Sequence, residues 1–231
     1  MEVRVLAYIR DLARRHRVLL LGGHAMILHG LDRSTTDSDI WLEPLSDASE
    51  WSRQLDSLLQ QYPAAYFWDL ASRRRCQPSE VAEVVDNFGV IRIGGLEEAL
   101  DIFRRPNNFS ETQFDEAWAL AASLPEEEVR VLSAIDLLAS KADTDRQKDL
   151  SDIVFLEGKI RSDYARILQT CSADEARQRF ARYSDHQTCR AALSNPDPAV
   201  RDFAIETLRE LAAGENPFAR ELLLEIERDA R

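Results

Sequence analysis

The amino-acid sequence predicts an α+β protein, in which a small mixed sheet flanked by helices is followed by an all-α carboxyl-terminal half. Three observations lead to this prediction. Short apolar or alternating segments, which are typical of strands, recur up to about residue 103. Glycines and prolines separate them from stretches with the apolar spacing of helices. Strand signals then fade from about residue 111, so we expect an α/β core over residues 1–110 and a helical domain over residues 111–231.

The amino-terminal half begins with a helix, because apolar residues recur at helical spacing between residues 2 and 15. The apolar run at 18–21 is typical of a short buried strand and ends at a glycine pair. Three further segments predict strands, and the last two lie on either side of a turn at Gly94-Gly95: 38–43, 90–95 and 98–103. Apolar spacing predicts helices at 24–30, 47–60, 79–88, 111–123, 133–141, 145–167, 197–212 and 217–229.

The charge of the chain restricts its partners. It has 29 Lys and Arg residues against 41 Asp and Glu residues, a formal net charge of −12. This balance argues against broad, non-specific attachment to nucleic acid or to anionic membranes. A nucleic-acid substrate would need a local basic patch, for which Arg73-Arg74-Arg75 and Arg104-Arg105 are candidates, with solvated surface as the alternative interpretation.

Neither a membrane segment nor a disulfide framework is expected. No run approaches about 18 apolar residues, and the charged amino terminus lacks the apolar region of a signal peptide. The three cysteines are widely spaced and form no C-x-x-C pair, which predicts neither disulfides nor a zinc site. A reducing cytoplasm is the compartment that fits this pattern.

The glycine pair Gly22-Gly23 lies between the predicted strand at 18–21 and the predicted helix at 24–30. Glycines at such a position let backbone N–H groups approach an anion, and the start of a helix favours negative charge. The pair is therefore a candidate phosphate cradle. An ordinary strand-to-helix turn would use the same residues, since no Walker lysine or dinucleotide fingerprint accompanies them.

Three aspartates on two predicted strands are candidate metal ligands. Asp37 and Asp39 are two residues apart on one strand and so point to the same face. Asp101 lies between Leu100 and Ile102 and projects away from the core. If the two strands pair, three carboxylates converge where the sequence offers no obvious cation, and Mg²⁺ is the expected counter-charge. The alternative for Asp101 is an acid exposed on an edge strand.

The ordered combination of these motifs resembles the DNA polymerase β-type nucleotidyltransferase superfamily. The glycine pair and short helix are followed by "RSTTDSDIWLEP", with the pattern Arg-x-Thr-x-Asp-x-Asp, and by the later strand acid. The segment "SAIDLLASKADTDRQKDLSDIVFL" resembles the Lys…Arg-x-Lys-Asp-x-x-Asp segment of the AbiEii-type branch of toxin-like minimal nucleotidyltransferases. The likeness covers about residues 18–157. His24 departs from the pattern, since many relatives carry a small hydroxyl residue there.

The resemblance implies a nucleotidyltransferase-like fold whose helical domain completes the active-site cleft. The implied reaction transfers a nucleotide from a nucleoside triphosphate to a hydroxyl of RNA such as tRNA, of a protein or of a small molecule. Asp37, Asp39 and Asp101 would be catalytic and bind Mg²⁺ or Mn²⁺. Gly22, Gly23, Arg33, Lys141 and Asp149 would bind the nucleotide. The branch also implies a possible role as the toxin of a toxin–antitoxin system, with an antitoxin protein as partner.

Several alternatives stay open at the level of the sequence. Lys141 is equally typical of a solvated lysine at a helix end, and Arg146, Lys148 and Asp149 of a surface ion network. Asp149 and Asp152, one helical turn apart, are candidates to orient Lys141 or contact a base. The four tryptophans are core or groove residues, one of which could stack on a nucleobase: Trp41, Trp51, Trp68 and Trp118. A catalytically silent scaffold that acts through protein partners is the alternative function.

Overall fold

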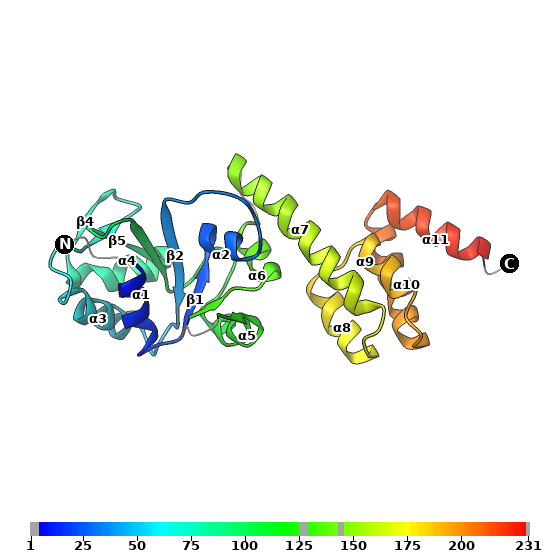
Figure 1. Ribbon diagram of the computed structural model, residues 1–231, viewed down its shortest axis with the longest axis horizontal. Helices are drawn as coiled ribbons and strands as arrows, with labels where there is room; N and C mark the ends of the chain where they lie inside the picture. The colour runs from blue at the N-terminus through cyan, green and yellow to red at the C-terminus, as the bar shows by residue number, and fades with distance from the viewer. Residues whose placement is uncertain (1–4, 125–128, 143–145, 230–231) are drawn as a thin grey trace. The chain divides into compact units, whose positions relative to one another are not determined.

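The computed structural model describes residues 5–124, 129–142 and 146–229. Its α-carbon contacts divide the chain into two compact units, Met1–Asp152 and Ile153–Arg231. The first unit is built on an eight-stranded mixed sheet, and the second is helical (Figure 1). The predicted α+β class with a helical carboxyl-terminal half is confirmed. The first unit extends well beyond residue 110, where we expected the α/β core to end.

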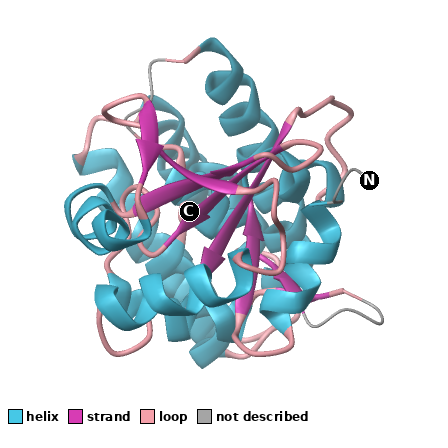
Figure 2. Ribbon diagram, turned by 90° about the vertical axis from the view of Figure 1, so that its left-hand side faces the viewer, coloured by secondary structure: helices cyan, strands magenta, loops and turns pink. Residues whose placement is uncertain are grey.

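The sheet has the strand order β4-β3-β5-β6-β2-β1-β8-β7. Its strands are β1 (Val18–Leu21), β2 (Asp37–Leu42), β3 (Tyr66–Asp69), β4 (Arg74–Cys76), β5 (Val90–Gly94), β6 (Ala99–Phe103), β7 (Ala122–Ser123) and β8 (Val129–Val131). The central strand β2 pairs in parallel with β6 and antiparallel with β1. Figure 2 looks onto the first unit and shows the twisted sheet flanked by helices. The prediction that the chain is entirely helical after residue 111 was wrong, because β7 and β8 lie there. Strands β3 and β4 were not predicted.

The helices of the first unit follow the apolar spacing of the sequence. They are α1 (Val5–Ala13), α2 (Gly22–Leu28), α3 (Ala48–Leu59), α4 (Val81–Phe88), α5 (Phe114–Leu120) and α6 (Ala134–Ser140), with short 3-10 turns at Pro78–Glu80 and Glu111–Gln113. The described part of the predicted helix at 2–15 is α1. The Asp47 side chain caps α3 by accepting a hydrogen bond from the Glu50 N–H, which satisfies one donor at the helix start.

One face of the sheet packs against α1, α3 and α4 to form the main core. The alternating strand residues Ile40, Leu42, Ile91 and Ile93 point into this core, and Trp51 and Leu55 of α3 pack with them. Because successive strand side chains point to opposite faces, the residues between them line the other face. On that second face Trp41 packs edge-on against Phe114 of α5, with ring centroids 5.2 Å apart.

The second unit contains α7 (Gln147–Leu168) beyond Asp152, α8 (Ala173–Arg182), α9 (His186–Ala192), α10 (Pro198–Ala213) and α11 (Pro217–Asp229). The buried Asn195 side chain donates to the carbonyl oxygens of Leu168 and Cys171, at 2.8 and 3.0 Å. These bonds satisfy backbone acceptors near the end of α7. Helices α8 and α9 were not predicted. No described helix of the chain is both long enough and apolar enough to span a membrane.

Candidate active site

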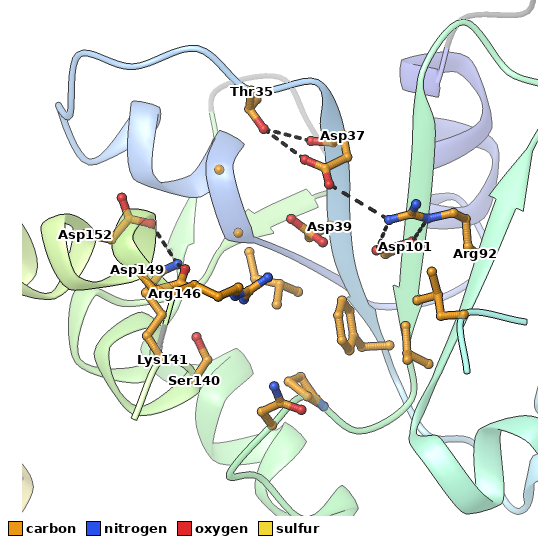
Figure 3. A pocket seen from close by; sticks show the side chains of 18 of the residues that line it. Thr35, Asp37, Asp39, Arg92, Asp101, Ser140, Lys141, Arg146, Asp149 and Asp152 are labelled. Atoms are coloured by element: carbon orange, nitrogen blue, oxygen red, sulfur yellow. Dashed lines mark hydrogen bonds and ion pairs between the residues drawn. The ribbon is translucent and has the colours of Figure 1, made fainter. Parts of the chain in front are cut away.

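The three predicted aspartates lie side by side on the second face of the sheet. Asp39 of β2 is paired in register with Asp101 of β6, and Asp37 is paired with Ala99. Leu100 and Ile102 point into the core on the opposite side, as their alternation with Asp101 predicted. All three carboxylates line one pocket of about 320 Å³ (Figure 3). The pairing of the two strands, on which the predicted convergence depended, is therefore present.

The glycine pair lets the polar side chains of the site approach the start of α2. Gly22 has a left-handed backbone with φ of +62°, which residues with a side chain rarely adopt. A Cβ at Gly22 would lie 1.8 Å from Asp39 Oδ2, and one at Gly23 would lie 2.4 Å from Thr35 Oγ1. Thr35 in turn donates to the Asp37 carbonyl oxygen at 3.1 Å. Glycine is thus required here both by backbone conformation and by close packing.

Replacement of Gly22 tests this close approach. We expect Gly22→Ala to lower the free energy of unfolding by about 2 kcal/mol, because it combines backbone strain with a clash against Asp39. Gly30→Ala is the matched control: Gly30 also has positive φ, +102°, but no atom lies within 4 Å of a Cβ there. Urea denaturation of both variants would separate the two contributions. Equal losses in the two variants would show that contact with Asp39 adds nothing to the strain.

A cation of the chain already accompanies Asp101. Arg92 of β5 donates from Nε to Asp101 Oδ1 at 2.6 Å and from Nη2 to Oδ2 at 2.8 Å. Its Nη2 lies 4.0 Å from Asp37 Oδ2. The bonds to Asp101 raise the pKa of Arg92, against the opposing effect of burial. The expectation that no cation of the protein is available to these carboxylates was therefore wrong.

The contact with Arg92 bears on how the aspartates fit a metal ion. Among the described residues, no group of three or more His, Cys, Asp or Glu side chains is arranged to hold a metal. Both Asp101 oxygens accept from Arg92, which compensates the charge of this carboxylate and leaves one lone pair on each oxygen for a metal. Asp37 and Asp39 form a pair of carboxylates on one face, and Mg²⁺ is commonly held by one or two carboxylates together with substrate phosphates. The donor set therefore fits a cation bound jointly with an anionic ligand.

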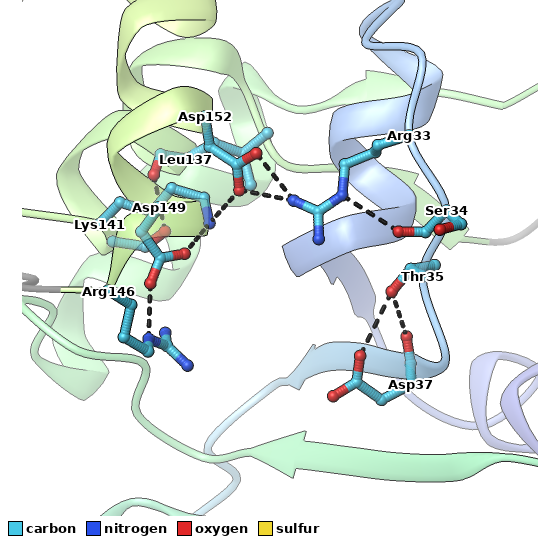
Figure 4. A network of polar contacts seen from close by, with 10 residues as sticks. Arg33, Ser34, Thr35, Asp37, Leu137, Lys141, Arg146, Asp149 and Asp152 are labelled. Carbon is cyan, nitrogen blue, oxygen red and sulfur yellow. Dashed lines mark hydrogen bonds and ion pairs between the residues drawn. The ribbon is translucent and has the colours of Figure 1, made fainter.

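A cluster of buried acids and cations forms the opposite side of the pocket (Figure 4). Asp149 and Asp152, at the start of α7, are 1% and 2% exposed. Lys141 Nζ lies 2.8 Å from an oxygen of each, Arg33 donates to Asp152 at 2.7 and 2.8 Å, and Arg146 Nε lies 2.6 Å from Asp149. Three cations are thus fixed beside the pocket by two carboxylates. The alternative of a solvated Lys141 does not fit this burial, whereas the Arg146 side chain is 67% exposed and meets Asp149 at the surface.

The lining of the pocket defines what it can bind. It contains four cationic side chains, Arg33, Arg92, Lys141 and Arg146, and five aspartates. Asp101, Asp149 and Asp152 are engaged with those cations, as described above. Fixed cations suit phosphate oxygens, whereas the Asp37 and Asp39 carboxylates suit a divalent cation. The arrangement can therefore bind a polyphosphate and a divalent cation together.

The structure brings all eight predicted site residues to this pocket: Gly22, Gly23, Arg33, Asp37, Asp39, Asp101, Lys141 and Asp149. Arg92 and the contact of Thr35 with Asp37 were not predicted. The sequence does carry a signal for Arg92, because it alternates with the buried Ile91 and Ile93 in a hairpin whose register places it opposite Asp101. His24 lies elsewhere, with its Nδ1 3.3 Å from Ser38 Oγ.

Comparison with known proteins finds a likeness to solved structures. No protein-family model and no curated protein sequence matches the chain. A crystal structure from H. pylori, provisionally assigned as a nucleotidyltransferase, is similar to 96% of this chain over 93% of its own length, with 12% identity and a TM-score of 0.36.

Proposed function

We propose that the protein is a nucleotidyltransferase that transfers a nucleotide from a nucleoside triphosphate to an acceptor hydroxyl. The observation that carries this proposal is the pocket shared by Asp37 and Asp39 on one side and three fixed cations on the other. The two sides are complementary to the two parts of a metal–triphosphate complex. The ordered motifs of the sequence, which resemble the DNA polymerase β-type superfamily, support the same reaction class.

In the proposed reaction the acceptor oxygen attacks the α-phosphorus of the triphosphate. A new P–O bond forms, the bond from the α-phosphorus to the bridging oxygen breaks, pyrophosphate leaves, and the proton of the acceptor hydroxyl passes to water. Mg²⁺ or Mn²⁺ held by Asp37 and Asp39 would supply Lewis-acid charge to the phosphate and the acceptor oxygen. Arg33, Lys141 and Arg146 provide positive charge for the triphosphate, and Asp149 and Asp152 keep those cations in place. Asp39 and Thr35 pack directly on Gly22 and Gly23, so the glycine pair would contribute to phosphate binding through its backbone N–H groups.

Asp101 has a narrower role in this proposal than the family pattern implies. Arg92 holds both of its oxygens, so the carboxylate serves first to position Arg92 between the aspartates. Contact of Asp101 with a metal or with the acceptor proton would use the lone pairs that Arg92 leaves, on a carboxylate whose charge Arg92 compensates. The second candidate function is a catalytically silent binding or scaffold module that keeps the fold and acts through protein partners, and the charge compensation of Asp101 by Arg92 is the observation in its favour.

Labelling identifies the reaction and its acceptor together. The protein is incubated with each α-labelled nucleoside triphosphate, Mg²⁺ or Mn²⁺, and separate RNA, protein and small-molecule fractions of a cell extract. We expect one fraction to take up label with the parent protein and none to do so with the Asp37→Asn/Asp39→Asn double variant. Equal labelling by the double variant would contradict the proposed site.

Triphosphate binding separates the two candidate functions. A triphosphate at about 100 times its dissociation constant should add about 2.7 kcal/mol to the stability of the parent. Metal-dependent stabilisation accompanied by labelling supports the transferase. The absence of both, with every triphosphate and either metal, would favour the binding module.

A further inference from the structure

A second pocket opens on the same face of the sheet as the three aspartates. It has a volume of about 430 Å³, and the strand residues that line it include Tyr66, Trp68, Arg92, Gly94 and Ala99. Arg92 lines this pocket and the candidate active site alike. The two pockets therefore meet at one side chain. The function proposed above assigns no role to the second pocket.

The strand register connects the second pocket to the catalytic aspartates. Arg75 of β4 is paired with Trp68 of β3, Trp68 with Arg92, Arg92 with Asp101, and Asp101 with Asp39. Residues paired across neighbouring strands share a face of the sheet, and strands lie about 4.8 Å apart. Trp68 is thus about 10 Å, or two strands, from Asp101.

The floor of the second pocket is made of small residues. Tyr66 is paired with Gly94, and Ala99 is paired with Asp37. A Cβ at Gly94 would lie 2.6 Å from Tyr66 Cζ and 2.8 Å from its hydroxyl oxygen. The Tyr66 ring consequently lies over Gly94, and only a residue without a side chain fits beneath it. Small side chains leave open space on the sheet between the aromatic residues and Asp37.

Tyr66 and Trp68 line this space, and Arg75 packs against the Tyr66 ring. We call the three residues Tyr66, Trp68 and Arg75 the aromatic platform. The Tyr66 and Trp68 rings meet edge-on with centroids 6.5 Å apart. The Arg75 guanidinium lies 4.0 Å from the centre of the Tyr66 ring. Half-buried aromatic rings beside arginine are the groups that bind unstacked bases and their phosphates.

Charges of both signs surround the second pocket, because the acids Glu97 and Glu98 line it and Glu97 is exposed. Arg73, Arg74 and Arg75 are exposed beside the platform. Glu98 lies at the rim but accepts a hydrogen bond from Ser38 Oγ at 2.5 Å. The second basic pair differs, since Arg104 is buried and bonded to Glu111 and to the Pro44 carbonyl oxygen. In the second candidate patch only Arg105 is exposed, whereas all three arginines of the first patch are exposed.

We propose that the aromatic platform is the acceptor subsite, and that the acceptor is a nucleotide with a free ribose hydroxyl. This inference rests on the function proposed above. A base stacked on Trp68 places its ribose toward Asp101 and Asp39, while the triphosphate occupies the first pocket beyond Arg92. A free nucleotide and the last nucleotide of a single-stranded RNA both offer an unstacked base and a free ribose hydroxyl, so either could be the acceptor. A base in a duplex must leave its pair and its stack to lie on Trp68, so we expect a single strand to bind more tightly than the matching duplex.

Binding measured without triphosphate and in chelator tests the platform independently of catalysis. The probes are adenosine monophosphate and a labelled eight-residue single-stranded oligoribonucleotide, with the matching duplex as a third arm. Trp68→Leu should weaken binding of a single-stranded probe about tenfold or more, since stacking of one base on an aromatic ring has that magnitude. Trp118→Leu is the matched control, because Trp118 is also half-buried but packs on Phe114 away from the pocket. It should leave affinity unchanged.

Gly94→Ala provides a second variant that keeps the platform residues. It should displace the Tyr66 ring and weaken probe binding while leaving stabilisation by metal and triphosphate intact. The inference is overturned if Trp68→Leu binds both probes as tightly as the parent does, or if the parent binds neither probe. Either result counts against the subsite even if the protein transfers nucleotides. If probe binding depends on Trp68 but the labelling experiment shows no transfer, the nucleotide-binding subsite is supported and the proposed transferase function is contradicted. Preference for the oligoribonucleotide over the monophosphate would identify an RNA end as the source.

Discussion

Replacement of Asp39 by asparagine is expected to lower the rate of nucleotide transfer by about a thousandfold or more without destabilising the fold. Loss of one carboxylate from the cation site removes several kcal/mol of transition-state stabilisation, and about 4 kcal/mol corresponds to this factor. In chelator, Asp37, Asp39 and Asp101 are three acids on one face, and Arg92 is bonded to Asp101. The denaturation midpoint of Asp39→Asn should therefore equal or exceed that of the parent. Metal with triphosphate should stabilise the parent alone.

Asp101→Asn is the matched control, because it also removes one charge from the same row of the sheet. The two bonds from Arg92 make Asp101 a structural partner, so we expect this variant to lose about 2 kcal/mol of stability. Denaturant titration in chelator compares the two variants directly. A lower midpoint for Asp39→Asn, with stabilisation by triphosphate intact, would show that Asp39 holds the fold together and that its catalytic assignment is wrong.

Local patterns were sufficient for the elements that carry the aspartates. The segment at 90–95 predicted β5, and the alternation of Leu100 and Ile102 with Asp101 predicted β6 and the face of Asp101. Elements without such patterns were missed. Strand β4 has two exposed arginines in three residues, and β8 has only three residues. Helix α8 is highly polar, with Ala176 as its buried residue, so it shows little apolar spacing.

The site was predictable as a set of positions but not as a set of contacts. Strand geometry alone places Asp37 and Asp39 on the same face. Asp101 lies next to them because β2 pairs with β6, which is the only long-range contact that the prediction required. The engagement of Asp101 by Arg92 depends on the register of the β5–β6 hairpin. The meeting of Arg33 with Asp152 joins residues 119 positions apart. Such contacts decide whether the charge of an acid is compensated by a cation of the chain, and local spacing does not contain them.

Lys141→Met is expected to weaken both the fold and triphosphate binding. Lys141 Nζ is held 2.8 Å from Asp149 and 2.8 Å from Asp152, both almost fully buried. Removal of one partner from a buried ion cluster typically costs about 3 to 5 kcal/mol, because charge is left without compensation. Arg33 and Arg146 still contact the two acids, so we expect a loss near 3 kcal/mol. A solvated lysine at the end of α6 would change stability by less than about 0.5 kcal/mol.

A double-mutant cycle with Asp152→Asn separates two roles of Lys141, stabilisation of the buried ion cluster and binding of the triphosphate. If Lys141 and Asp152 act as one unit, the double variant loses less stability than the sum of the two single variants, by about 1 to 3 kcal/mol. Triphosphate affinity should behave differently. Lys141→Met removes a cation from the pocket and should reduce affinity about tenfold, whereas Asp152→Asn retains all three cations and should reduce it less. Additive losses of stability, together with unchanged triphosphate affinity in Lys141→Met, would assign Lys141 to neither role. Chemical denaturation gives the first quantity, and metal-dependent triphosphate titration of the same four proteins gives the second.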